Sequence, residues 1–276
     1  MVTRRSVVIP GFSLTLGITL LYVSMIVLAP LMALVGKSFD QGWDQFIHVV
    51  GGPRALASYQ LTLSAAFAAT LFTATYGLLM AWILARYEFP GRRLLDAMMD
   101  LPFALPTAVA GVALTAAFAT NGFLGHWLSL LGIKVTYTPL GVTLAMAFTS
   151  VPFVVRTVQP VIEHLEPELE EVAGCLGADR WQTFAKVIFP AILPAYMTGC
   201  SMAFARCLGE FGAVIFIAGN LPFKTEITAL LIYIRLEEYD YAGAASIASV
   251  VLAAAFAMML TTNLLQARLV RFSEKI

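Results

Sequence analysis

The chain has 276 residues, of which 59% are hydrophobic and only 12% are charged, and its 17 basic residues balance its 17 acidic ones. Soluble domains carry about twice this share of charge. A chain so poor in charge cannot cover a water-facing surface, which excludes a soluble globular enzyme and a disordered chain, and the zero net charge excludes a nucleic-acid binder. The mean hydropathy of +0.83 indicates a membrane protein. Three cysteines are too few for a disulfide framework, and no two of them have zinc-ligand spacing.

Six apolar runs are long enough to cross a bilayer, which takes about 20 mostly apolar residues in a helix. They lie between Arg5 and Lys37, between Arg54 and Arg86, over 101–125, over 137–155, from Val187 onwards, and between Tyr241 and Arg268. The first run is longer than the core of a signal peptide and no cleavage site follows it, so we expect a retained helix. A further run, 211–223, is short and contains glycine and proline, so we expect a re-entrant or interfacial piece, with a seventh span as the alternative. The sequence thus predicts an all-α integral membrane protein built as a six-helix bundle.

The distribution of basic residues predicts the orientation, because loops rich in Lys and Arg stay in the cytoplasm. With the N-terminus inside, the inside segments hold most of the basic residues, namely Arg4, Arg5, Arg86, Arg92, Arg93, Arg156, Arg180, Lys186, Arg268, Arg271 and Lys275. The outside segments hold only Lys37, Arg54, Lys134, Arg206, Lys224 and Arg235. We therefore expect both termini in the cytoplasm.

The loop over 156–186 is the most charged part of the chain, and the orientation places it in the cytoplasm. Pro167 suits the first turn of a helix, and the glutamates that follow it suit the positive end of the helix dipole. Gly177 suits a left-handed helix end, and Asp179 with Gln182 forms a capping-box pattern that starts a second helix. We expect a short helix, a glycine corner and a second helix that runs into the membrane at Pro190.

A spaced motif in this loop resembles the EAA loop of ABC importer permeases, whose pattern is E-A-A-x3-G-x9-I-x-L-P. The chain matches it at Glu171, Ala173, Gly177 and Pro190, and departs from it at Val172, Val187 and Phe189. In that family the loop is a coupling helix that docks on a cytoplasmic ATPase. The resemblance implies the four matching residues as coupling residues, whereas the residues alone also fit a loop that packs on its own bundle.

Three longer runs, 100–111, 148–160 and 208–220, resemble the sulfate/thiosulfate permeases of the same family. The resemblance implies the type I ABC importer permease (MetI-like) architecture. Residues 1–56 would then be an additional transmembrane helix with an outer loop, 57–268 the permease core with the coupling loop 156–186, and 269–276 a cytoplasmic tail. A molybdate or tungstate permease is the main alternative, and an ion-coupled secondary transporter is a further one.

The same resemblance implies the partners and the place in the cell. We expect a multi-pass protein of the cell inner membrane that forms a heterodimer with a second, CysW-like permease, with a homodimer as the alternative. A CysA-like ATPase dimer would use ATP and Mg, and a periplasmic protein would deliver sulfate or thiosulfate. The chain itself matches no catalytic or metal-binding motif, so we expect a transport subunit that is not an enzyme and binds no cofactor.

Arg206 and Glu210 lie within an apolar run, where each charge costs about 2.5–3.5 kcal/mol on insertion scales. Because they are four residues apart, they can pair on one helix face. The pair is either structural or part of a gate on the path of the anion, in which Gly209 and Gly212 would let the chain bend.

Two further groups of residues have alternative interpretations. Pro102, Pro106 and Pro194 lie near predicted helix starts, where proline is tolerated, or serve as hinges for alternating access. An amphipathic helix is predicted over 224–240 on the outer side. It either lies at the membrane interface or contacts the binding protein, for which the candidates are Lys224, Glu226, Glu237 and Glu238.

Overall fold

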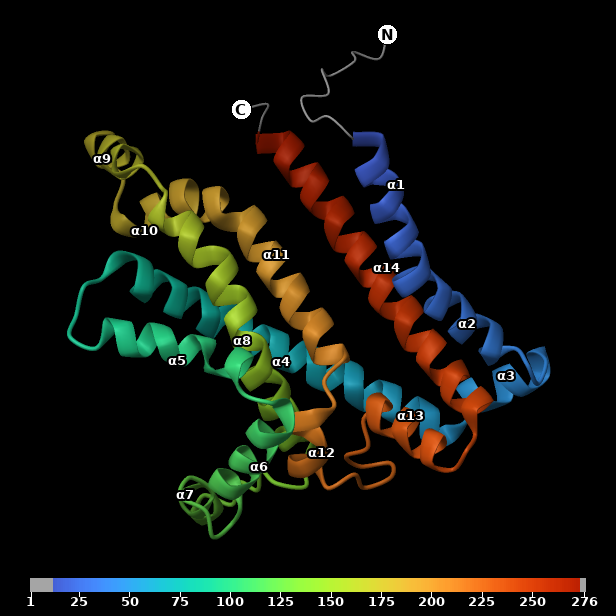
Figure 1. Ribbon diagram of the computed structural model, residues 1–276. Coiled ribbons are helices and arrows are strands. Elements are labelled where there is room, and N and C mark those ends of the chain that lie inside the picture. Colours follow the sequence, from blue (N-terminus) through green and yellow to red (C-terminus); the bar gives the residue numbers. More distant parts are fainter. Residues whose placement is uncertain (1–11, 274–276) are drawn as a thin grey trace.

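A computed structural model describes residues 12–273, and every regular element in this range is a helix (Figure 1). Five stretches are long and apolar enough to cross a membrane. They are 12–38, made of α1 (Phe12–Val23), a π-helical turn (Ser24–Leu28) and α2 (Ala29–Ser38); α4 (Pro53–Arg86); α8 (Pro139–Glu163); 180–208, made of α10 (Arg180–Thr183), a π-helical turn (Phe184–Ile188) and α11 (Phe189–Leu208); and the first part of α14 (Tyr241–Ser273). Arg4, Arg5 and Lys275, used above to predict the orientation, lie outside the described residues.

The third predicted span differs from the expected single helix over 101–125. It is a pair, α5 (Arg92–Ala104) and α6 (Thr107–Phe118), bent by 116° at Leu105 and Pro106. Proline disfavours the helical conformation of the residue before it, and Leu105 is extended, with φ −82° and ψ 134°. Counted as one span, the bent pair brings the described spans to six, as the sequence predicts.

Short helices complete the fold. They are α3 (Trp43–Val50), α7 (Gly125–Leu130), α9 (Pro167–Cys175), α12 (Gly212–Ala218) and α13 (Thr228–Glu237). With seven residues, α12 is about 10 Å long at 1.5 Å per residue, so it is a short buried piece and not a seventh span. The start of α1 and the end of α14 lie at the same end of the molecule as α9 and α10, while α3, α7, α12 and α13 lie at the other end (Figure 1).

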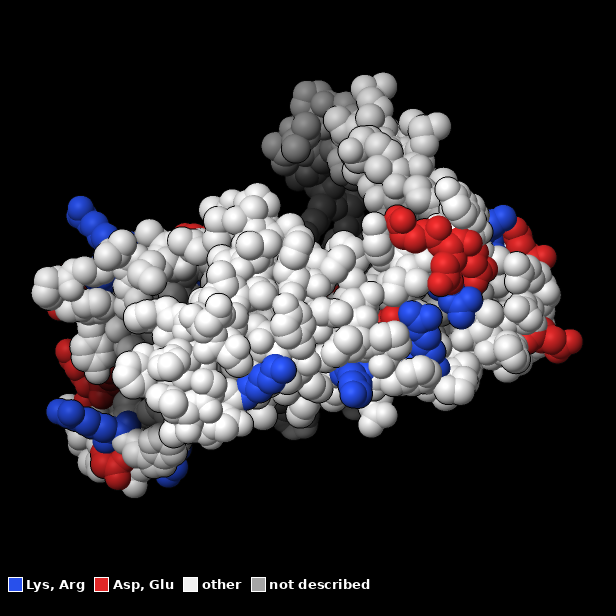
Figure 2. Space-filling model, turned by 90° about the horizontal axis from the view of Figure 1, so that it is seen from below, with Lys and Arg blue, Asp and Glu red and all other residues white. Residues whose placement is uncertain are grey.

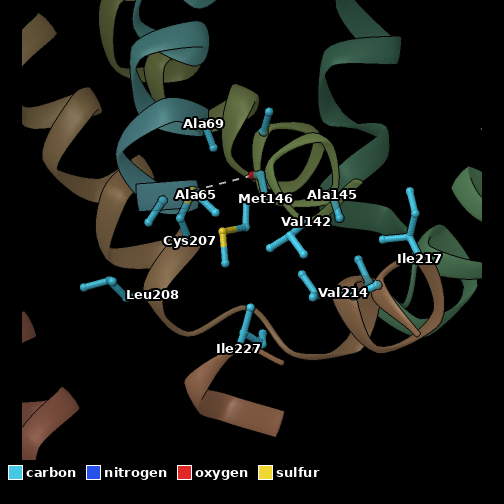
Figure 3. Packing of buried hydrophobic residues seen from close by; sticks show 14 of the residues in the cluster. Ala65, Ala69, Val142, Ala145, Met146, Cys207, Leu208, Val214, Ile217 and Ile227 are labelled. Carbon is cyan, nitrogen blue, oxygen red and sulfur yellow. Dashed lines mark hydrogen bonds between the residues drawn. The ribbon is translucent and has the colours of Figure 1, made fainter. Parts of the chain in front are cut away.

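Helices α4, α8 and α11 form the centre of the bundle, where α8 packs between the other two. Close approach depends on glycine, because a Cβ on Gly77 of α4 would lie 2.8 Å from the Cβ of Val154. An apolar cluster joins α4, α8, α11 and α12, and there the Cys207 thiol donates a hydrogen bond to the carbonyl of Met146 (Figure 3). Helix α8 runs on to Glu163, beyond the expected end of the fourth span at Val155, so Arg156 is a helix residue and not a loop residue.

The first span packs differently from the rest. None of its most apolar window is buried within the chain, and its neighbour is α14, where the Ser246 hydroxyl donates to the carbonyl of Ser38. Seen from the end that carries α7, α12 and α13, most charged side chains lie toward the two ends of an elongated face, and the surface between them is mainly uncharged, with isolated basic side chains (Figure 2). The bundle therefore offers a large apolar perimeter to lipid or to another membrane helix.

Candidate functional site

The segment between α8 and α11 folds as the sequence predicts. Pro167 is the first residue of α9, and Gly177 adopts the left-handed conformation with φ +82°. The amide of Ala178 donates to the carbonyl of Ala173 at 3.0 Å, which closes the helix end. Asp179 then caps α10, since its carboxylate accepts the Gln182 amide at 2.7 Å and its own amide donates to the Gln182 side chain at 3.3 Å. The result is a rigid corner that projects from the bundle.

This corner exposes apolar side chains. Leu176 is 83% exposed and Trp181 72%, and Leu169 and Val172 are also exposed on α9. Ala173 is buried, at 7% exposed, and lies at the base of these side chains on α9. An open groove of about 540 Å³ runs along the corner, between Leu169, Val172 and Leu176 on one side and Gln182 and Lys186 on the other. Exposed apolar groups that cluster in this way mark a site of contact with another protein or with the membrane.

The corner is tied to the bundle by the inner end of α4. The Arg86 guanidinium forms an ion pair with Glu170 and lies 5.6 Å from the centre of the Trp82 ring. The Trp82 ring in turn meets Phe184 edge to face at 5.6 Å. Glu170 is therefore the carboxylate that anchors the corner to α4.

The four residues of the spaced motif have different surroundings. Glu171 is exposed, and its side chain makes no hydrogen bond or ion pair within the described part of the chain. Ala173 and Gly177 build the corner itself. Pro190 is the second residue of α11 and follows a π-helical turn, in which the Phe189 amide donates to the carbonyl of Phe184. A wider turn suits this position, because proline cannot complete the regular helical ladder.

Arg206 and Glu210 form the ion pair that their spacing predicts. An Arg206 Nη2 nitrogen lies 2.7 Å from Glu210 Oε2, and the Glu210 side chain is only 1% exposed. The other oxygen of Glu210, Oε1, accepts the Ala213 amide at 2.9 Å. The carboxylate thus joins the outer end of α11 to the start of α12.

The two glycines beside this pair do different things. A Cβ on Gly212 would lie 2.1 Å from the Thr107 hydroxyl, and a Cβ on Gly111 would lie 2.6 Å from the carbonyl of Ala213. Gly212 on α12 and Gly111 on α6 therefore allow these two helices to touch along their backbones. Gly209 ends α11, and an added Cβ there would make only ordinary contacts near 3.9 Å. Close packing, and not bending, explains Gly212 in this structure.

The predicted prolines also fall into distinct places. Pro106 lies at the 116° bend between α5 and α6, whereas Pro102 lies inside α5 and Pro194 inside α11. The Thr198 hydroxyl donates to the carbonyl of Pro194 at 2.8 Å. Only Pro106 coincides with a break in a helix.

On the outer side, the expected amphipathic helix is α13, which is shorter than the predicted range 224–240. Its own Leu230 and Leu231 are buried, as is Ile227 directly before it. The structure corrects the prediction that Glu226 contacts the binding protein. Its side chain is only 1% exposed, and its two carboxylate oxygens accept hydrogen bonds from Arg54 at 2.8 and 2.6 Å. This pair fastens the start of α13 to α4, a link that a separation of 172 residues hides from local sequence patterns.

The other predicted contacts, Lys224, Glu237 and Glu238, are exposed. Hydrogen bonding to the Glu237 carboxylate raises the pKa of the Tyr233 hydroxyl on the same helix. Among residues 12–273, no group of three or more His, Cys, Asp or Glu side chains could hold a metal ion.

Comparison with known proteins identifies the family. Residues 74–274 match the family described as "Binding-protein-dependent transport system inner membrane component". The sulfate transport system permease protein CysT of Escherichia coli K12 is 58% identical over 95% of this chain and 94% of that protein. A probable sulfate transport system permease of Nephroselmis olivacea is 49% identical over 91% of this chain and 88% of that protein.

A solved structure has the same fold. The crystal structure of a bacterial ABC transporter involved in the import of the acidic polysaccharide alginate matches with a TM-score of 0.75 and 18% identity, covering 94% of this chain and 96% of that one. Together with the family match, this confirms the expected ABC importer permease fold, and the family description confirms an inner-membrane, non-catalytic component that works with an ATPase and a binding protein. The chain belongs to the family of binding-protein-dependent transport system inner membrane components.

Proposed function

We propose that this chain is a permease subunit of an ATP-driven importer that carries sulfate across the inner membrane. The observation that carries this proposal is the 58% identity to the sulfate permease of Escherichia coli over 95% of the chain. Thiosulfate has the same charge and a similar tetrahedral shape, and we include it as a second substrate. A molybdate or tungstate permease would share the fold, whereas an ion-coupled transporter would not need an exposed corner such as that of α9 and α10.

The exposed apolar corner is the proposed docking site for the ATPase. Leu169, Val172 and Leu176 would fill a groove on that partner, and Glu171 would be free to meet a basic group there. ATP and Mg would be bound by the ATPase dimer, which we expect to be CysA-like. Because α8 leads into the corner and α11 leads out of it, a displacement of the corner would move two central helices.

The second half of the pathway is proposed to come from a related, CysW-like permease. A periplasmic binding protein would deliver the anion at the end that carries α13, where Lys224, Glu237 and Glu238 are exposed and Glu226 is not. Arg206 is the proposed pathway residue. Since Glu210 already neutralises part of its charge, it would hold a dianion weakly and release it. Gly209 would give the chain freedom beside it, and Pro102, Pro106 and Pro194 are the proposed hinges.

The test is uptake of labelled sulfate into vesicles that contain the complete complex, with binding protein outside and ATP inside. We expect uptake that requires ATP and the binding protein and that excess thiosulfate reduces. Stronger competition by molybdate than by thiosulfate would favour the molybdate alternative. Uptake that follows an imposed ion gradient in the absence of ATP would contradict the proposal.

The gate has its own test in the same vesicles. Glu210→Gln frees the Arg206 charge, so we expect tighter retention of sulfate and slower uptake. A Glu210→Gln complex with normal uptake and no sulfate leak would leave the pair with a structural role only. Normal uptake by both Pro106→Ala and Pro194→Ala, at normal expression, would argue against the hinges.

A further inference from the structure

Arg156 on α8 uses its whole guanidinium group to hold α5. Its Nε and Nη2 atoms donate to the two carboxylate oxygens of Asp100, at 2.7 and 2.6 Å. Its Nη1 atom donates to the Asp96 carboxylate at 2.6 Å and to the Gln159 side chain at 3.0 Å, and Nη2 also reaches the Asp96 carbonyl at 2.9 Å. One side chain therefore makes five hydrogen bonds, four of them to a different helix.

The cluster continues toward the inner end of α8. The Gln159 amide donates to the Glu163 carboxylate at 3.0 Å, and Arg92 at the start of α5 lies 3.8 Å from the same carboxylate. Glu163 is the last residue of α8, and α9 begins four residues later at Pro167. The ion-pair cluster thus lies directly beside the corner that we propose docks on the ATPase.

At its other end, α5 leads to the bend at Pro106 and into α6. Helix α6 then touches α12 along the backbone at Gly111 and Ala213. The three sequence runs 100–111, 148–160 and 208–220 meet along this line: the first supplies Asp100 and Gly111, the second Arg156, and the third Glu210 and Ala213. A continuous set of contacts joins the corner, α8, α5, α6 and α12.

We propose that Arg156 is the positioning residue that makes α5 follow α8, so that displacement of the corner reaches the bent span. This inference rests on the proposed transport function and adds a residue that the spaced motif does not contain. Arginine suits the task, because its planar fork binds one carboxylate with two parallel hydrogen bonds and still has donors for a second. Apolar contact between the helices, such as the edge-to-face pair Phe103 and Phe153 at 5.1 Å, can slide and does not fix their register.

The first experiment measures sulfate carried per ATP hydrolysed by the reconstituted complex. For Arg156→Gln we expect this ratio to fall about tenfold, a size typical of coupling between sites, while ATP hydrolysis continues. Arg156→Lys keeps the charge but loses the fork, so we expect an intermediate ratio. Arg93→Gln is the matched control, because Arg93 is exposed on the same α5 and forms no ion pair within the described residues.

A purely structural role for Arg156 would reduce assembly, and with it uptake and ATP hydrolysis in proportion, which leaves the ratio unchanged. An unchanged ratio in Arg156→Gln, or an equal fall in Arg93→Gln, would overturn the inference. If the Arg156→Gln complex does not assemble, Asp100→Asn is measured instead, because asparagine keeps one acceptor oxygen for Arg156. An unchanged ratio of sulfate to ATP in Asp100→Asn would equally overturn the inference.

A second readout does not depend on sulfate. Spin labels at Met98 on α5 and at Glu166, three residues after the end of α8, in a chain whose Cys175, Cys200 and Cys207 are replaced by alanine, report whether α5 moves together with the segment that joins α8 to the corner. We expect one narrow distance with and without ATP in the parent protein, and a broadened or ATP-dependent distance in Arg156→Gln. Identical distributions in both would overturn the inference, whereas a parent complex that moves but carries no sulfate would count against the proposed function alone.

Discussion

The outer end of the molecule and the inner corner differ in how they hold particular carboxylates. At the outer end, the carboxylates of Glu210 and Glu226 are each only 1% exposed, and each has an arginine partner. At the inner end, Glu171 has no recorded partner among the described residues, and Leu176 and Trp181 are more than two thirds exposed. The outer end therefore pairs these two buried carboxylates with arginines of the same chain, while the inner corner leaves Glu171 and several apolar side chains exposed.

Breaking an outer ion pair should have the largest effect on stability. Arg54→Met leaves the buried Glu226 carboxylate unpaired, and such a loss costs about 3–5 kcal/mol. We expect a clear fall in the melting temperature of the purified protein. Lys224→Met removes a neighbouring exposed charge and serves as the control, with little change expected; equal melting temperatures for the two variants would refute the structural role of the pair.

The contact between α6 and α12 should be next in size. Gly212→Ala places a methyl group 2.1 Å from the Thr107 hydroxyl, and overpacking of this kind costs about 1–3 kcal/mol. Gly209→Ala, only three residues away, has room for the same methyl group and should melt close to the parent protein. If Gly209→Ala proves the more harmful, flexibility and not packing would explain this pair of glycines.

At the inner corner, Gly177→Ala forces an alanine into the left-handed conformation, which costs about 1–2 kcal/mol. We expect a modest loss of stability and a larger loss of sulfate uptake, because the corner angle sets the docking surface. Gly174→Ala lies on the same α9 with nothing near an added Cβ, so it should leave uptake intact. A parallel loss of uptake in both variants would show that the angle at Gly177 is not special.

The smallest effect on stability is expected on the exposed face of the corner. Leu176→Glu alters a side chain that is 83% exposed, so the free energy of unfolding of the isolated permease should change by no more than about 0.5 kcal/mol, with a correspondingly small shift in its melting temperature. Co-purification of the ATPase should nevertheless fall, because the apolar docking face is interrupted. If Leu176→Glu destabilises the permease while the ATPase still co-purifies, Leu176 would serve the packing of the corner and not a docking face.

The sequence was most informative where the structure depends on neighbouring residues. The caps at Pro167, Gly177 and Asp179, and the pair of Arg206 with Glu210, follow from spacings of a few residues and were all predicted correctly. The family resemblance was likewise confirmed. The break in the third span was not predicted, because the hydropathy of 101–125 is continuous, although Pro106 itself was named as a candidate hinge and its effect on Leu105 was available as a signal.

The pairs that join distant parts of the chain could not be predicted. Arg54 with Glu226, Arg86 with Glu170, and Arg156 with Asp100 are separated by 172, 84 and 56 residues, and no periodic pattern relates such positions. Their charges were visible in the sequence, and all three arginines were counted for the orientation. Their partners became evident only once the helices were packed.

The most direct test of the account is photo-crosslinking from the exposed corner in the complete complex. A photoreactive amino acid at Leu176 should form an adduct with the ATPase subunit, and one at Leu130, which is 67% exposed on α7 at the other end, should not. An adduct at Leu176 with lipid or with the permease alone, and none with the ATPase, would contradict the claim that the inner corner is left open for this partner.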